Sequence, residues 1–526
     1  MSDSRKLNVI GLTQGANVDI FLLYIQQIRN MGQRVDKVGV VASFASHFNS
    51  SQNVKNLGQD VVVIKEWEIV KRAIERVSAV DFSILQKKEE KLAPAAVWKS
   101  IIGDRRLIYG RRAKYTQDYR VEFSDVQLWS MAHHFIEAFE RMLNEVKPDV
   151  ILGFTPVTFG ELLALEIAES KGVPTLQLHS SRIKNYFALH DSISGTSEHF
   201  RSLVNKNTFK KKTLEIAESV IEEVFKKGLV YEGANESLSL GRKFQVFNVI
   251  KSAPKAIVKE GLKAINRESR TDHHDPGHVI PWFYTQILQP LKEGLIRFRL
   301  RSHKRIVKVN SLSAAKPYCF FPLQSEPEVS IQVLGRPYHK NQIELLRNLA
   351  ASLPAGFKLV VKEHPRSLGL RPFSFYKQLF EIPNLYLVEP HASSMPIVNQ
   401  AEFVAVISGT IGLEAIIAKK PVLILGHPKY EGIEGNMTQK CYNLFELADV
   451  IRILLANYRY DRKVVIRFLS ALIEGSVCID LYSSLLGKPG RYSFQNETVS
   501  VEDNTRTLAR YVLKRINEVR GKNERV

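Results

Sequence analysis

Residues 403–426 have the sequence FVAVISGTIGLEAIIAKKPVLILG, which predicts a strand, a tight turn, a helix and a second strand. Residues 403–407 are apolar and rich in β-formers, and small polar residues follow them. Residues 411–418 have helical spacing, and residues 421–426 form an apolar run typical of a buried strand. This alternation predicts an α/β fold with a parallel sheet.

The turn in this unit, formed by Ser408, Gly409 and Thr410, is a candidate anion site. Free backbone N–H groups and the positive end of the helix dipole meet at such a turn. An ordinary capped turn is the alternative, and it uses the same N–H groups. Glu414 lies one helical turn further on, where we expect it either to contact a ribose hydroxyl or to be a solvated helix residue.

A second turn of this kind lies about forty residues upstream, in LVVKEHP at residues 359–365. The proline ends the strand, so His364 is expected at the carboxyl end of the sheet, where open α/β sheets bind ligands. His364 can donate a hydrogen bond to a phosphate, and Lys362 adds positive charge. Alternatively, His364 is hydrogen-bonded within the protein and Lys362 is solvated. Two such turns in one unit nevertheless favour a shared phosphate site.

A polar loop, PLQSEPE at residues 322–328, follows the first predicted strand of this half. Prolines restrict its conformation at the edge where a cleft is expected. We expect Gln324 and Glu326 to contact the ligand, and a plain connecting loop is the alternative.

Length and composition predict two domains in a soluble globular protein. The chain has 526 residues, of which 44% are hydrophobic and 24% charged. The first half repeats the α/β pattern, with strands predicted at residues 7–12, 38–42, 61–64, 149–154 and 175–178. We predict two facing Rossmann-like domains with these boundaries: 1–194, a helical basic middle segment 195–316, 317–500, and a C-terminal helix 501–526 that packs back on the first domain.

Three residues of the first half are candidates for contact with the acceptor. Glu161 begins a helix after a turn, so it is either the base that deprotonates an acceptor hydroxyl or an acid that complements the helix dipole. His179, at the end of the next strand, is a rival base. Gln14, in the first turn, is expected to touch the acceptor or the leaving group.

The formal net charge of +20 favours anionic partners. The basic run at residues 297–308, RFRLRSHKRIVK, is expected to lie on an anionic membrane surface or to hold a polyanionic chain, with a solvated helix face as the alternative. No zinc finger, RNA-binding aromatic motif or P-loop is present, so we expect no nucleic-acid partner.

Two further features concern metals and compartment. The segment TDHHDPGH at residues 271–278 has metal-ligand residue types, but its expected setting in a polar loop favours no metal site. No Asp-x-Asp follows a predicted strand, and we expect no cofactor. Three widely spaced cysteines favour a reducing compartment, and no apolar run is long enough to span a membrane. We therefore expect a cytoplasmic protein, peripheral to the inner face of the cell membrane.

These motifs resemble those of the capsule polysaccharide biosynthesis proteins, whose best-known members transfer Kdo from CMP-Kdo. The resemblance covers roughly residues 317–430 and rests on PLQSEPE, on LPAGFKLVVKEHP at 353–365 and on SGTIGLEAIIAKKPVLILG at 408–426. The His-Pro and Ser/Thr pair is also similar to bacterial sialyltransferases and polysialyltransferases of the GT-B type. Teichoic-acid polymerases share a Lys-x-His-Pro turn, but their later hydroxyl motif differs.

The resemblance implies a GT-B fold with the active site between two domains. It implies that His364, Ser408 and Thr410 hold the nucleotide phosphate and that Glu414 holds the ribose. We therefore predict a metal-independent glycosyltransferase that moves a sugar, with a CMP-linked acidic sugar favoured, to a polysaccharide or glycolipid acceptor. A nucleotide-sugar 2-epimerase, a polyol-phosphate transferase and a non-catalytic polyanion-binding protein remain the alternatives.

Overall fold

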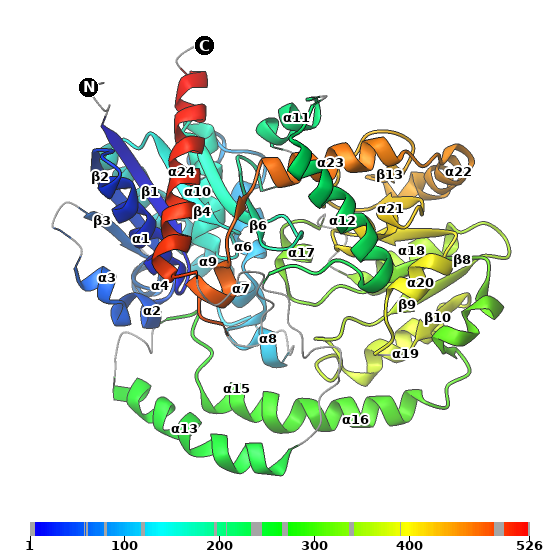
Figure 1. Cartoon of the computed structure of the whole chain (residues 1–526). Coiled ribbons are helices and arrows are strands. Elements are labelled where there is room, and N and C mark those ends of the chain that lie inside the picture. The colour runs from blue at the N-terminus through cyan, green and yellow to red at the C-terminus, as the bar shows by residue number, and fades with distance from the viewer. Residues whose placement is uncertain are drawn as a thin grey trace.

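The computed structural model describes residues 6–56, 58, 61–77, 81–116, 121–193, 197–206, 208–232, 245–265, 272–335, 341–389, 391–488 and 499–523. Two seven-stranded sheets form the cores of two domains, which Figure 1 shows side by side.

The first sheet has the order β14-β6-β5-β4-β1-β2-β3. Its parallel part is made of β1 (Leu7–Thr13), β2 (Val35–Ala42), β3 (Val61–Lys65), β4 (Val150–Phe154) and β5 (Thr175–Ser180). Two antiparallel strands extend it, β6 (Tyr186–His190) and β14 (Val477–Cys478). The order 3-2-1-4-5 of the parallel part is the Rossmann order.

Helices cover both faces of this sheet because successive strand residues point to opposite sides. Val9 packs toward α1 (Asn17–Asn30) and α24 (Val501–Asn523), whereas Ile10 faces the other layer. That second layer consists of α4 (Glu66–Glu75), α9 (Asp125–Val146) and α10 (Phe159–Ser170).

The second sheet is parallel throughout, with the order β13-β12-β11-β8-β9-β10-β7. Its strands are β7 (Ile306–Val307), β8 (Tyr318–Pro322), β9 (Lys358–Lys362), β10 (Leu385–Val388), β11 (Phe403–Val406), β12 (Val422–Ile424) and β13 (Thr438–Lys440).

One face of the second sheet packs against α18 (Gln342–Ala351), α19 (Phe373–Glu381) and α22 (Leu447–Asn457). The other face packs against α11 (Glu198–Val204), α12 (Lys211–Lys227), α20 (Met395–Gln400), α21 (Ile411–Ile417) and α23 (Arg462–Glu474).

A helical arm, formed by residues 245–265 and 272–300, lies along the lower side of both domains in Figure 1. It comprises α13 (Val246–Ile265), α15 (Val279–Phe283), a π-helix (Tyr284–Leu288) and α16 (Gln289–Leu300). No helix in the described part of the chain is both long enough and apolar enough to cross a lipid bilayer.

Short helices occupy the remaining connections. They are α2 (Ala45–Ser50), α3 (Gln52–Lys55), α5 (Phe82–Glu89), α6 (Ala96–Gly103), α7 (Arg105–Tyr109), α8 (Ala113–Thr116), α17 (Val329–Gln332), the 3-10 helices Val309–Ala315 and Leu444–Glu446, and the π-helix Leu481–Leu485.

The predicted fold class, two Rossmann-like α/β domains with a helical basic middle segment, is confirmed. The sequence patterns did not reveal β6, β7, β13 and β14. Three of these strands have only two or three residues, and the fourth, β6, returns antiparallel after a short turn.

Candidate active site

A cavity of about 980 Å³ lies between the two domains. The turns after β1 and β4 and the end of β5 line it from the first domain. The ends of β8 and β9 and the turn after β11 line it from the second. These are carboxyl ends of parallel strands, the edge at which open α/β sheets bind ligands.

The cavity brings together most of the residues predicted from the sequence. Those that line it are Gln14, His179, Gln324, Lys362, His364, Ser408, Gly409 and Thr410. Glu161, Glu326 and Glu414 are not among the lining residues.

His364 is positioned by its own turn to act as a neutral hydrogen-bond donor. Its Nδ1 accepts the backbone N–H of Arg366 at 3.2 Å, so the ring proton belongs on Nε2. Burial and the nearby charges of Arg366, Lys362 and Arg371 lower the pKa of His364 to about 3. The imidazole is therefore neutral near pH 7, and Nε2 is the donor that it can offer to an anion.

Two glycines explain the sequence of the Ser-Gly-Thr turn. A Cβ on Gly409 would lie 2.6 Å from Nε2 of Gln324, and one on Gly412 would lie 2.0 Å from the hydroxyl of Tyr430. Tyr430 in turn donates to the Gly409 carbonyl at 2.6 Å. The side chain of Ser408 donates to the Ser330 carbonyl at 2.6 Å, which ties this turn to α17.

Lys362 and Glu414 are both buried, and each influences the charge of the other. Burial lowers the pKa of Lys362, while Glu414 and Glu363 oppose this shift. Burial raises the pKa of Glu414 to about 7, although the Leu229 N–H and Lys362 lower it. Because Glu414 Oε1 accepts the Leu229 N–H at 2.8 Å, this oxygen is already used within the protein.

The loop at 322–328 is held by Arg371, which is 2% exposed. Its guanidinium donates to Glu326 at 3.1 Å and to the Gln324 carbonyl at 2.7 Å, and it lies 3.2 Å from Glu363. Glu326 also accepts from Gln342. Glu326 therefore shapes the loop from behind, whereas Gln324 lines the cavity.

In the first domain, Glu161 forms a capping box with Thr158 at the start of α10. Its Oε2 accepts the N–H of Val157 at 2.9 Å, and burial raises its pKa to about 8. This geometry gives Glu161 a capping role at the start of the helix, and with a pKa of about 8 the side chain carries little charge near pH 7. The role as a base stays a prediction. His179 lines the cavity, and its Nδ1 lies 3.3 Å from the Thr155 hydroxyl.

Basic residues dominate the charged lining of the same cavity, and all of them except Lys362 were missed by the sequence prediction. Eight Lys and Arg side chains face two Glu side chains there: Arg105, Arg106, Arg111, Arg182, Lys362, Arg366, Lys429 and Lys488 against Glu328 and Glu363. The run RRLIYGRR at 105–112 carried a signal, since two arginines begin the short helix α7 and two follow it. The sequence around this run does not indicate that the helix lies at the cavity.

Two hydrogen bonds connect the domains across the cavity walls. Arg105 donates to the Pro327 carbonyl at 3.0 Å, and Lys429 donates to the Ser180 carbonyl at 3.2 Å. Both bonds join a basic side chain of one domain to a main-chain carbonyl of the other.

Residues 272–275 lie in a loop of polar residues, as predicted, but this loop is buried. Asp272, His273 and His274 are at most 1% exposed. Asp272 accepts the N–H groups of Ala45 and His274, both at 2.9 Å, and so docks the segment on the first domain.

Residues 247–449 match the model of a protein family described as capsule polysaccharide biosynthesis protein. This match confirms the resemblance inferred from the motifs of the second half. None of the curated protein sequences matches the chain significantly.

Similar solved structures include two of KpsC from Thermosulfurimonas dismutans, described as a beta Kdo 2,7 transferase and a beta Kdo 2,4 transferase. The first is 16% identical, covers 77% of this chain and 95% of its own, and has a TM-score of 0.33. The second is 11% identical, covers 71% and 87%, and has a TM-score of 0.34. A UDP-GlcNAc 2-epimerase from Methanocaldococcus jannaschii is 13% identical, covers 87% and 94%, and has a TM-score of 0.23.

Proposed function

Because residues 247–449 match the capsule polysaccharide biosynthesis family, we propose that this protein is a glycosyltransferase. It uses a nucleotide-activated sugar, with a CMP-linked acidic sugar favoured, and a polysaccharide or glycolipid acceptor. The observation that carries the proposal is the cavity between the two sheets, in which eight basic side chains face two acidic ones. Such a site suits a phosphate together with an anionic sugar.

The donor phosphate lies against the second domain in this proposal. His364 donates through Nε2, and the N–H groups around Gly409 and Thr410 complete the anion site. As the glycosidic bond to phosphate breaks, these donors and Lys362 stabilise the charge that develops on the departing phosphate. The acceptor approaches from the first domain, where His179 and Gln14 line the opposite wall.

The first test measures thermal stability with CMP, CDP, UMP, UDP, GDP and ADP, each with and without added Mg²⁺. A ligand that binds only the folded state raises the melting temperature by mass action. We expect stabilisation by CMP without Mg²⁺. A response to UDP or GDP alone would mean that the donor sugar is linked to that nucleotide and not to CMP. No response to any nucleotide would overturn the proposal.

The base is tested with two variants, Glu161→Gln and His179→Gln, assayed for sugar transfer. The glutamine of the first variant keeps an oxygen that can accept the N–H of Val157, so the helix cap survives. Because Glu161 does not line the cavity, we expect its variant to keep most of its turnover. Loss of turnover in a folded Glu161→Gln protein would assign the base to Glu161.

Exposed apolar residues on α13 support contact between the helical arm and a membrane surface. On α13, Phe247, Ile250, Ile257, Val258, Leu262 and Ile265 are each at least 59% exposed. They recur at helical spacing along one stripe, and the exposed lysines Lys251, Lys255 and Lys259 lie within it or along one of its edges. An apolar stripe with such lysines suits the surface of an anionic bilayer, where a lipid-linked acceptor would be found.

The basic run predicted at residues 297–308 contributes less to the proposed membrane-facing surface than α13 does. Arg297 and Phe298 on α16 are exposed, but Ile296 and Leu300 pack into the second domain. Arg305 donates to the carbonyls of Phe380 and Ile382 and so belongs to the fold.

The membrane proposal is tested by co-sedimentation with vesicles that contain phosphatidylglycerol. We expect the double variant Ile257→Asp, Leu262→Asp to bind at least tenfold more weakly with an unchanged melting temperature, because both side chains are exposed. Phe445→Asp is the matched control, since Phe445 is 98% exposed but lies outside the arm. Equal binding of all three proteins would contradict the proposal.

A further inference from the structure

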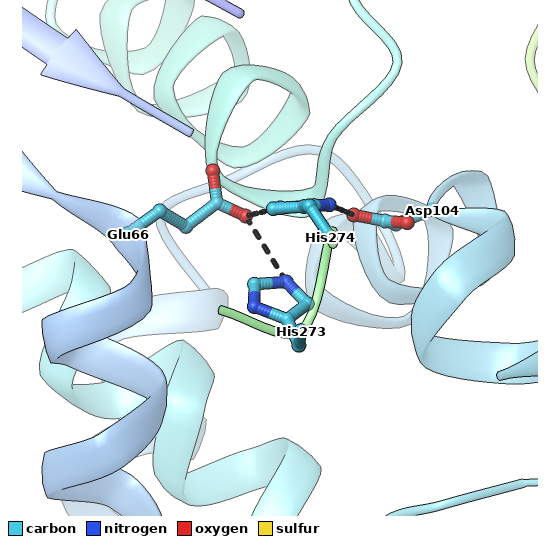
Figure 2. Close-up of side chains that lie close together, drawn as sticks. All are labelled: Glu66, Asp104, His273 and His274. Atoms are coloured by element: carbon cyan, nitrogen blue, oxygen red, sulfur yellow. Dashed lines mark hydrogen bonds and ion pairs between the residues drawn. The ribbon is translucent and has the colours of Figure 1, made fainter. Parts of the chain in front are cut away.

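Two imidazoles and two carboxylates converge inside the first domain, next to the cavity. They are Glu66, Asp104, His273 and His274, each at most 1% exposed. One donor atom from each lies within 4.8 Å of the others. Figure 2 shows Glu66 at one end of the His274 ring and Asp104 at the other, with His273 beneath.

The distances within this cluster suit a shared metal ion. Glu66 Oε1 lies 3.1 Å from His274 Nε2 and 3.7 Å from His273 Nε2. Two donors bound at about 2.1 Å to a tetrahedral Zn²⁺ are about 3.4 Å apart, and the observed distances lie on either side of this value. Glu66 Oε1 and the two Nε2 atoms therefore surround one small volume.

Hydrogen bonds do not explain why the polar ring of His273 is buried. Neither of its ring nitrogens has a hydrogen-bond partner, and Nδ1 of His274 has none either. Buried polar groups in folded proteins are almost always paired. A proton on His274 would connect Glu66 to Asp104, but it would leave His273 without a partner. A metal ion bound at Nε2 of both rings would give His273 a partner for this nitrogen.

The surrounding contacts hold the donors in place. The Thr158 hydroxyl donates to Glu66 Oε2 at 3.1 Å, and Oε1 accepts the Gly160 N–H at 3.4 Å and faces the histidines. Asp104 Oδ2 lies 3.8 Å from His274 Nδ1, on the side of the ring away from Glu66. A carboxylate behind a ligating histidine is the usual way in which a ligand ring is oriented. Phe44 stacks on His274 at a centroid distance of 4.9 Å and shields the cluster.

We propose that Glu66, His273 and His274 bind a divalent transition metal of the zinc class, with Asp104 as the residue that orients His274. The metal joins segment 272–278 to the start of α4, and Asp104 connects His274 to the start of α7. His274 and Pro276 line the cavity, so the metal also fixes the wall where the arm meets the first domain. Its role is structural, and it stands independently of the proposed sugar transfer.

The test is elemental analysis of tag-free protein purified without chelators. We expect about one zinc-class ion per chain in the wild type and at least a tenfold lower content in Glu66→Gln and His273→Gln. His133→Gln is the matched control, because His133, His134 and Glu137 form the other candidate group in the described part of the chain. Wild-type protein that lacks metal even after incubation with Zn²⁺, or metal lost only in His133→Gln, would overturn the proposal.

A second measurement needs no variant. X-ray absorption at the metal edge of the wild-type protein should show two imidazoles and only nitrogen and oxygen donors. Sulfur donors, or fewer than two imidazoles, would contradict the assignment. Chelation should lower the melting temperature, and Zn²⁺ should restore it. If the chelated protein is still stabilised by CMP, the metal site and the donor site are separate, as proposed.

Discussion

At the scale of single residues, His364 illustrates how the turn and the side chain act together. Its Nδ1 is used by the Arg366 N–H, and only Nε2 is left to meet a ligand. Glutamine places an N–H near the position of Nε2, whereas asparagine places an oxygen near the position of Nδ1. The two substitutions therefore separate ligand binding from support of the turn.

We expect His364→Asn to fold normally and to lose about 100-fold in turnover, a typical cost of removing one donor to a developing anion. His364→Gln should retain more activity than His364→Asn. The measurements are initial rates together with melting temperatures of both variants. Full activity in His364→Asn would remove His364 from the phosphate site.

Glu414 predicts how stability depends on pH. Its pKa is raised from the ordinary value of 4.5 to about 7, mainly by burial. A carboxyl group whose pKa is higher in the folded state favours folding at low pH, and this contribution is lost as the pH rises from about 4.5 to about 7. Glu414→Gln should therefore flatten the decline of the melting temperature over this range. A parallel decline in both proteins would show that Glu414 does not titrate in this way.

At the scale of elements, the sequence predicted the strands and turns that carry the second-domain part of the site. The reason is that β8, β9 and β11 are short apolar runs that end at proline, glycine or polar residues, so their ends are visible locally. Arg105, Arg106 and Lys429 could not be placed in this way. Their contribution depends on how the two domains face each other.

The turn before α21 allows a direct test of its two glycines. Alanine at position 412 would collide with Tyr430 and disturb its hydrogen bond to Gly409, so we expect a loss of about 1–3 kcal/mol in stability and weaker nucleotide binding. Gly261→Ala in α13 is the control, because no atom lies within 4 Å of the added Cβ. That change should stabilise the helix by about 0.5–1 kcal/mol. Chemical denaturation of both variants tests the contrast, which equal stabilities would refute.

At the scale of the whole molecule, the excess of basic groups in the cavity predicts how affinity depends on salt. Charged ligands in a partly solvated site bind more weakly as ionic strength rises, whereas neutral ligands respond little. We expect the affinity for CMP, measured by calorimetry, to fall severalfold between low and high salt. Cytidine, which lacks the phosphate, is the control. A CMP affinity that does not change with salt would contradict this electrostatic picture.

The return of α24 to the first domain has a consequence for synthesis on the ribosome. Leu508, Ala509, Val512 and Ile516 are at most 2% exposed within a core that also contains β1 and α1. The core of the first domain is therefore complete only after residues some five hundred positions beyond β1 have been synthesised. The second domain, whose strands lie between residues 306 and 440, is complete earlier. During translation the second domain can therefore complete its core before the first domain, although the first domain begins earlier in the sequence.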